Sequence, residues 1–212
     1  MDIAQIRKEY TKQKLSKKSV DADPLIQFKK WLYEALQSDC LEPTAMTVST
    51  ISQKNTPASR VVLLKGVEDG KFVFFTNYNS RKGNHLEQNP NISALFFWPE
   101  LERQVNIEGR VVKSSNSASD TYFNSRPWKS RIGAIISPQS QSIDSRTVIK
   151  KAFVLEAAKH ITDSIPRPNH WGGFEIIASR IEFWQGRENR LHDRILFSRD
   201  SDNQWVVSRL AP

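Results

Sequence analysis

The sequence predicts a mainly β protein, a β-barrel with peripheral α-helices. Short runs rich in β-branched and aromatic residues recur along most of the chain, and helical patterns interrupt them. Strands and helices do not alternate strictly, as they do in a doubly wound parallel sheet. No internal repeat or linker divides the chain. We therefore expect a basic N-terminal arm over residues 1–22 and a single domain over residues 23–212.

Local patterns predict the elements of the first half. Asp23 followed by Pro24 is typical of a helix N-cap and first turn, and apolar residues at helical spacing extend this helix to about residue 38. We expect strands over 45–51, 59–65 and 71–76, the last two joined by a turn at Glu68-Asp69-Gly70. A short helix begins at Ser80, and strands follow over 92–98 and 102–113, where Gly109 marks a bulge.

The second half is expected to contain three helices and three strands. Helices are predicted over 118–124, 128–136 and 145–160, and strands over 174–184, 191–198 and 205–210. Pro127 separates the first two helices, because the residue before a proline avoids the α region. The N-terminal arm is dense in Lys and Arg and has few core residues, so we expect it to be mobile or partly helical.

Composition narrows the class of protein. The 212-residue chain has 31 basic and 23 acidic side chains, and its formal net charge of +8 favours nucleic acid, acidic lipid or small phosphorylated partners. No apolar run approaches the ~18 residues of a membrane span, and the charged N-terminus lacks a secretory apolar region. The single cysteine, Cys40, excludes an internal disulfide framework. We expect a cytoplasmic protein without a metal site.

The usual phosphate-binding loops are absent from the sequence. The eight glycines form neither the dinucleotide-binding pattern G-x-G-x-x-G nor the P-loop pattern. The chain also lacks the G-x-S-x-G elbow of hydrolases, and no pair of histidines has the i, i+4 spacing of a zinc site. If the protein binds phosphates, its Lys and Arg side chains must therefore hold them.

Several groups of side chains are candidates for that task. On an extended backbone Arg190, His192 and Arg194 point to one face, either as a binding strip or as a charged edge strand that resists aggregation. Arg60 and Lys65 bracket an apolar strand, where they are either ligands or simply its solvated ends.

Three further groups lie near predicted helix ends, strands and loops. Arg81 and Lys82 follow Ser80 at a helix start, where unpaired N–H groups and the helix dipole attract anions, although an ordinary capped surface helix has the same pattern. Residues 122, 126 and 130 are spaced by four across a proline corner and either converge on a phosphate or are unrelated. Three polar side chains suit a heterocycle: Gln104, Gln139 and Ser140.

The C-terminal segment resembles the signature of the pyridoxamine 5′-phosphate oxidase family, the FMN enzymes of vitamin B6 metabolism. The matching residues are Glu182-Phe183-Trp184-Gln185 and, four residues later, Arg190-Leu191-His192-Asp193-Arg194. The resemblance extends over nearly the whole chain, through segments 7–10, 23–25, 60–65, 75–77, 80–82, 101–105, 122–127, 139–140, 171–173 and 209–212. It implies a split β-barrel homodimer with two FMN sites at the subunit interface.

The resemblance also implies residue roles by position. FMN contacts would fall on Arg60, Val61, Val62, Leu63, Leu64, Lys65, Phe75, Thr76, Arg81, Lys82, Gln104, Gln139, Ser140, Trp184 and Arg194. The substrate phosphate would be held by Lys65, Tyr122, Arg126 and Ser130. Arg190 and His192 would be the catalytic pair at the reacting end of the pyridine, with Arg7 and Tyr10 closing over it as a lid. Pro138 has no N–H group to donate just before Gln139, so the transfer of family roles by position is weakest in that loop.

The implied reaction is oxidation of pyridoxine or pyridoxamine 5′-phosphate to pyridoxal 5′-phosphate. Hydride would pass from C4′ to flavin N5, dioxygen would accept the electrons and form hydrogen peroxide, and the amine substrate would release ammonia. Two rival functions stay open at this point. One is a non-catalytic nucleic-acid binder, which the basic charge suggests. The other is a flavin reductase or haem-related member of the split-barrel group. We expect small phosphorylated B6 vitamers as partners, with neither nucleic acid nor membrane.

Overall fold

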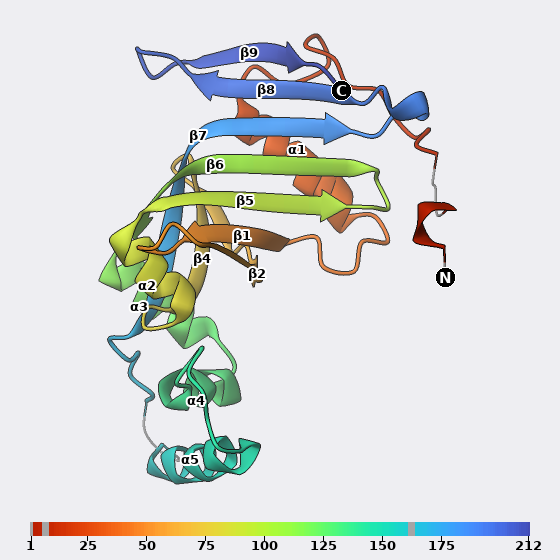
Figure 1. Cartoon of the computed structure of the whole chain (residues 1–212). Coiled ribbons are helices and arrows are strands. Elements are labelled where there is room, and N and C mark those ends of the chain that lie inside the picture. Colours follow the sequence, from red (N-terminus) through yellow and green to blue (C-terminus); the bar gives the residue numbers. More distant parts are fainter. Residues whose placement is uncertain (1, 6–8, 161–163) are drawn as a thin grey trace.

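A nine-stranded antiparallel sheet that curls into a half-barrel dominates the computed structural model, which describes residues 2–5, 9–160 and 164–212 (Figure 1). This architecture confirms the predicted mainly β fold with peripheral helices. The strand order is β2-β1-β5-β6-β7-β4-β3, and β8 joins β7 to β9. The strands are β1 (Ala45–Ile51), β2 (Pro57–Leu63), β3 (Gly66–Glu68), β4 (Lys71–Asn77), β5 (Asn91–Trp98), β6 (Arg103–Lys113), β7 (Trp171–Gln185), β8 (Asp193–Arg199) and β9 (Trp205–Leu210).

The sheet divides along β7, which is 15 residues long. Its first half pairs with β4 and its second half with β8, while β6 runs beside both halves. The β6–β7 register shifts between Glu108 and Gly109, which confirms the expected bulge. A Cβ atom on Gly109 would lie 2.1 Å from the carbonyl oxygen of Ile177, so only glycine allows this close approach.

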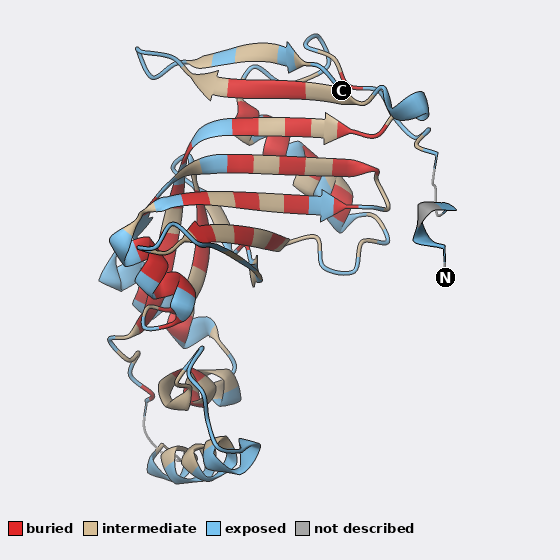
Figure 2. Cartoon of the chain, in the orientation of Figure 1, coloured by how far each residue is buried: buried red, intermediate tan, exposed pale blue. Residues whose placement is uncertain are grey.

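Helix α1 (Pro24–Leu36) covers the concave face of the sheet and provides the centre of the core (Figure 1). Its start is as predicted: the Asp23 side chain accepts a hydrogen bond from Leu25 N–H, and a proline occupies the first position. Phe28 and Trp31 are buried, and the Trp31 ring meets that of Phe183 at 5.2 Å between centroids. Buried positions alternate along the neighbouring strands, as expected for a sheet with one covered face (Figure 2).

The predicted hairpin before β4 has a different first strand. Strand β2 pairs with β1, whereas the short β3 pairs with β4. Glu68 and Lys71 face each other across a two-residue turn, in which Asp69 and Gly70 have φ values of 46° and 79°. Positive φ at both positions is typical of a type I′ turn. The expected strand over 59–65 was therefore wrong at its end, because β2 stops at Leu63.

Four more helices surround the open end of the half-barrel: α2 (Arg81–Gln88), α3 (Asn116–Ser125), α4 (Trp128–Ile136) and α5 (Arg146–Lys159). Short 3₁₀ turns cover Ile3–Gln5 (η1) and Glu188–Arg190 (η2). A second buried cluster joins α3 and α4 to the sheet through Phe123, Ile132 and Trp171. Within the described part of the chain, no helix combines the length and apolar character needed to cross a bilayer.

The bulge gives a stability prediction. Gly109→Ala should lower the free energy of unfolding by about 1–3 kcal/mol, because the new Cβ displaces the β7 backbone. Gly133→Ala in α4 is the matched control: its Cβ would meet open space, and alanine favours a helix by up to about 1 kcal/mol. Denaturant unfolding measures both variants, and equal stability of the two would contradict this account of the bulge.

Candidate active site

A cleft of about 850 Å³ opens between the edge strand β2, the end of β4, the start of α2 and the α3–α4 corner. Most of the side chains that the resemblance assigned to cofactor or substrate phosphate line it. They are Arg60, Val61, Val62, Leu63, Lys65, Phe75, Thr76, Arg81, Lys82, Tyr122, Arg126, Ser130, Gln139 and Ser140. Leu64 is the exception in its segment, because its side chain is buried in the main core.

Lys82 is the most buried cation of the cleft. Its Nζ donates to Thr76 Oγ1 at 2.8 Å, to Gln139 Oε1 at 3.0 Å and to Ser80 Oγ at 3.3 Å. Burial, together with the positive charge of Arg60, lowers the pKa of Lys82 to about 8. The ammonium therefore has neutral hydrogen-bond acceptors but no counter-ion among them, and a bound anion would stabilise its charged form.

Arg60 and Arg81 place two more positive charges at the same wall. Burial lowers the pKa of Arg60, and the charge of Arg81 adds to this effect. Ser80 caps α2 as predicted, because its Oγ accepts from Gly83 N–H. Among the described residues that line the cleft there is no Asp or Glu. The cleft thus concentrates like charges without neutralising them, an arrangement suited to an anionic ligand.

An aromatic wall faces these cations. The Phe75 and Tyr122 rings stack at 3.9 Å, and Trp171 lies parallel to Phe75 at 5.6 Å. The Arg126 guanidinium lies 4.6 Å from the Trp171 ring centroid, and its buried Nη1 has no hydrogen-bond partner among the described residues. Burial lowers the pKa of Arg126. A buried donor without a partner is rare in proteins and indicates a place for a ligand oxygen.

The α3–α4 corner brings three predicted residues together. Tyr122 lies in α3, Arg126 follows its last residue, and Ser130 lies in the first turn of α4. Pro127 breaks the helix between them, as expected, and all three side chains line the cleft. The three side chains therefore converge on one cleft instead of lying apart on the surface.

Trp171 and Asn77 are among the lining residues that the sequence analysis did not assign to the site. Trp171 entered only as part of the matching segment 171–173, although its ring forms part of the aromatic wall. Asn77 entered only within segment 75–77, and its Nδ2 donates to the Ser137 carbonyl at 3.2 Å and ties segment 137–140 to β4. The available signals were a tryptophan directly before two glycines and an asparagine at the end of an apolar strand.

Gln104, Trp184 and Arg194 line a different, smaller cavity of about 360 Å³ on the convex face of the sheet. Arg194 donates to both carboxylate oxygens of Glu182, at 2.7 and 3.0 Å. These bonds raise the pKa of Arg194. Within one chain, the residues assigned to the cofactor are therefore divided between two cavities.

The predicted strip of Arg190, His192 and Arg194 on one strand is wrong. Strand β8 begins at Asp193, and Arg190 lies in the η2 turn with a φ of 60°. The turn breaks the alternation of side chains that the prediction assumed. Arg190 is exposed, whereas Arg194 is held by its carboxylate partner.

His192 lies in a small aromatic cluster. Its ring is 4.7 Å from Trp184 and 5.8 Å from Tyr10, measured between centroids. Its Nδ1 accepts from Arg187 N–H at 3.1 Å, so the neutral ring carries its proton on Nε2. Burial and the charge of Arg190 lower the pKa of His192 and favour that neutral form. The expected lid residue Arg7 lies outside the described residues.

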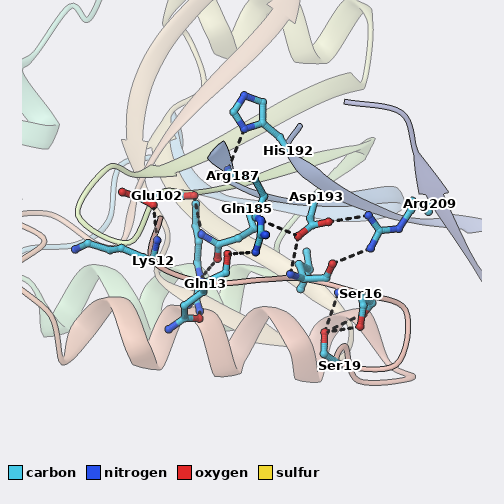
Figure 3. Close-up of polar contacts among 12 residues, drawn as sticks. Lys12, Gln13, Ser16, Ser19, Glu102, Gln185, Arg187, His192, Asp193 and Arg209 are labelled. Atoms are coloured by element: carbon cyan, nitrogen blue, oxygen red, sulfur yellow. Dashed lines mark hydrogen bonds and ion pairs between the residues drawn. The ribbon is translucent and has the colours of Figure 1, made fainter. Parts of the chain in front are cut away.

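The N-terminal arm is tied to the edge of the barrel beside this cluster (Figure 3). Lys12 N–H donates to Glu102 Oε2, and Leu15 N–H donates to Asp193 Oδ2, both at 3.0 Å. Arg209 closes the arrangement by donating to Asp193 Oδ1 at 2.7 Å and to the Leu15 carbonyl at 2.8 Å. Leu15 is itself buried. Over these residues the arm is anchored by hydrogen bonds, and its only described helical part is the η1 turn at Ile3–Gln5.

Asp193 is the centre of this anchor. Burial alone raises the pKa of its carboxyl group, but the hydrogen bonds from Leu15 and Arg209 and the charges of Arg209 and Arg187 outweigh it, and the net pKa is lowered. The Asp193 carboxylate therefore stays ionised at pH values below those at which an aspartate usually takes up its proton. Because Asp193 directly follows His192, it connects the arm to the aromatic cluster.

The curled half-barrel with a cationic, aromatic-walled cleft defines the chain as a split β-barrel protein. The family profile described as "Pyridoxamine 5′-phosphate oxidase" matches residues 32–158, and one described as "Pyridoxine 5′-phosphate oxidase C-terminal dimerisation region" matches residues 171–212. The chain belongs to the pyridoxamine 5′-phosphate oxidase family and is an oxidoreductase.

Curated relatives agree with this assignment, and solved structures share the fold. Proteins named "Pyridoxine/pyridoxamine 5′-phosphate oxidase" are 54% identical over 211 residues in Bacteroides thetaiotaomicron (100% of this chain, 99% of the relative) and 50% identical over 210 residues in Leptospira interrogans (99% and 98%). PhzG from Burkholderia lata, solved with tetrahydrophenazine-1-carboxylic acid, has a TM-score of 0.87 at 27% identity and covers 92% of this chain and 95% of its own. A pyridoxamine 5′-phosphate oxidase-related, FMN-binding protein from Nostoc punctiforme shares the fold, with a TM-score of 0.71 at 16% identity over 87% and 97% of the two chains.

Lys82 predicts a pH dependence of anion binding. Sulfate keeps its double negative charge between pH 7 and 10. The affinity of the cleft for sulfate should therefore fall as the pH rises through about 8, because Lys82 then loses its proton. Calorimetric titration between pH 7 and 10 at constant ionic strength measures the effect. Lys82→Gln should bind sulfate more weakly with a flat pH profile. The same slope in wild type and variant would assign the titration to another group.

The anchor predicts protease sensitivity. Asp193→Ala removes the acceptor of Leu15 N–H and the partner of Arg209, so trypsin should cut after the exposed Lys12, Lys14 or Lys17 about tenfold faster. Asp202→Ala, in the exposed β8–β9 turn, is the control and should match wild type. Unchanged cleavage in Asp193→Ala would show that Asp193 does not hold the arm.

Proposed function

We propose that this protein oxidises pyridoxine 5′-phosphate and pyridoxamine 5′-phosphate to pyridoxal 5′-phosphate with FMN as its cofactor. The observation that carries the proposal is the cleft, where basic side chains from three separate parts of the chain gather without a carboxylate among the described lining residues: Arg60 and Lys65, Arg81 and Lys82, and Arg126. The family assignment supports the same substrate class.

The residues of the cleft fit a phosphorylated flavin. Arg60, Arg81 and Lys82 would hold the phosphate, with Thr76 as a hydroxyl donor. Gln139 and Ser140 would face the heterocycle, and the apolar segment from Val61 to Leu63 with Phe75 would flank it. Side-chain cations thereby do the work that a glycine-rich loop does in other nucleotide sites.

The substrate phosphate is assigned to the α3–α4 corner and to Lys65. The buried Nη1 of Arg126 has no partner among the described residues, so a phosphate oxygen would satisfy it. Tyr122 and Ser130 would add hydroxyl donors, and the exposed Lys65 would add a second charge. Binding energy obtained at this remote phosphate would orient the reacting carbon.

The divided site favours a homodimer. Gln104, Trp184 and Arg194 belong to the flavin contacts by family position but line a cavity on the convex face of the same chain. A second copy packed on that face would bring its own set to the first chain's cleft. Exposed apolar side chains on this face, Val61 and Phe97, suit burial between subunits, and the C-terminal family profile is named for dimerisation.

Arg190 and His192 are the proposed catalytic pair. Arg190 would fix the substrate against the flavin through the N–H donors of its guanidinium group. The Nε2–H of His192 would donate a hydrogen bond to the substrate, because Nδ1 is already engaged by Arg187 N–H. Tyr10, in contact with the His192 ring, would close over the reacting group, and Arg7 is proposed beside it.

When bound, FMN would supply the redox chemistry, taking hydride from C4′ of the substrate at N5 and passing the electrons to dioxygen as hydrogen peroxide. The amine substrate also consumes water and releases ammonia.

We propose the cytoplasm as the compartment, since the chain's one cysteine, Cys40, forms no disulfide. A nucleic-acid binder would place its cations along an open groove, whereas here they converge on a single cleft.

Kinetics of two variants test the assignments. Purified protein with added FMN should release hydrogen peroxide in proportion to pyridoxine 5′-phosphate oxidised. Lys65→Ala should mainly raise KM, by about tenfold, because it removes a phosphate contact. Arg190→Ala should mainly lower kcat, by about tenfold or more, because the reacting end of the substrate is then held less firmly against the flavin.

The outcomes separate the hypotheses. Wild-type kinetics in Arg190→Ala would remove this residue from the active site. Absence of peroxide from wild type with either B6 vitamer, combined with salt-dependent binding of single-stranded nucleic acid, would favour the rival binding function.

A further inference from the structure

A buried chain of hydrogen bonds lies behind the cations of the cleft. The Nη1 atom of Arg60 donates to Thr50 Oγ1 at 2.7 Å and to the Val48 carbonyl at 3.3 Å. Thr50 Oγ1 lies 3.1 Å from Nδ1 of His85. Thr50 is fully buried and His85 is 8% exposed, so water does not compete for these contacts.

The chemistry of the groups sets the direction of this chain. A guanidinium has only donors, so Thr50 must accept from Arg60. In the His85 tautomer that carries its proton on Nε2, Nδ1 accepts the remaining hydroxyl proton of Thr50. Burial and the charges of Arg81 and Arg60 lower the pKa of His85 and favour that neutral ring.

The chain connects the two elements that bear the phosphate-facing cations. Thr50 lies in β1, diagonal to Arg60 in the paired strand β2. His85 lies in α2, four residues after Arg81 and three after Lys82, one turn along the helix. The orientation of the Arg60 guanidinium is thus coupled to the position of the helix that presents the other two cations.

We infer that Thr50 and His85 are positioning residues that hold the Arg60 guanidinium for the phosphate group of the ligand in the cleft. The inference rests on the proposed FMN site but names residues outside its contact set. Among the described residues Arg60 has no carboxylate partner, so without Thr50 its long side chain would sample other rotamers. A charge-assisted bond to a buried hydroxyl removes that freedom before the ligand arrives.

The test compares FMN with riboflavin, which has the same ring system but no phosphate. Thr50→Val keeps the side-chain shape and removes the hydroxyl. It should weaken FMN binding by about tenfold and leave riboflavin binding unchanged, as measured by quenching of flavin fluorescence. Thr56→Val makes the same chemical change at an exposed position before β2 and should behave as wild type.

His85 provides the second variant. His85→Asn keeps an acceptor near the Nδ1 position and should retain most of the preference for FMN, whereas His85→Leu should lose it as Thr50→Val does. If wild type prefers FMN and both Thr50→Val and His85→Leu keep that preference, the positioning role is wrong while the proposed function stands. If wild type does not discriminate FMN from riboflavin, the proposed phosphate site itself fails, and this inference fails with it.

Discussion

The β6–β7 ladder and its bulge at Gly109 are the constraint on which the rest of the architecture depends. Two backbones approach there closer than any side chain allows, and this point lies beside the middle of β7, where its other edge changes partner from β4 to β8. The β4 half of β7 leads to the cleft through Trp171, and the β8 half leads to Trp184 and Arg194 on the convex face. One long strand thus positions both parts of the proposed site.

Without a bound anion, the positive charges of the cleft are in an unfavourable electrostatic environment. Burial and mutual repulsion lower the pKa values of Arg60 and Lys82, and the described lining offers no carboxylate in compensation. Neutral oxygens of Thr50, Thr76 and Gln139 hold these cations in place instead. The cations of such a site have no internal ion pairs. An anion can therefore bind without first breaking existing salt bridges.

The convex-face residues are organised by different means. Arg194 is neutralised by Glu182, and His192 is oriented through Arg187 N–H and ring contacts with Trp184. The arm reaches this region through the Asp193 anchor, so residues near the two ends of the chain, Leu15 and Arg209, meet beside it. Residues that act on a reacting group benefit from rigid placement, whereas residues that bind a phosphate benefit from a charge that is not already paired.

The sequence alone determined the element types, the caps at Asp23 and Ser80, and the bulge, because these depend on neighbouring residues and on backbone geometry. It also determined that Lys and Arg side chains must replace a glycine-rich loop. It misjudged the C-terminal strip, since a positive φ at Arg190 interrupts the assumed alternation.

Only the tertiary structure decided which cations share a cleft, that Trp171 belongs to its wall, and that the arm is anchored. Those outcomes depend on contacts between residues far apart in the chain, such as Leu15 with Asp193 or Arg60 with Thr50 and, through it, His85. Local propensity carries no information about such pairs, because they form only when the sheet curls and brings distant strands and helices together.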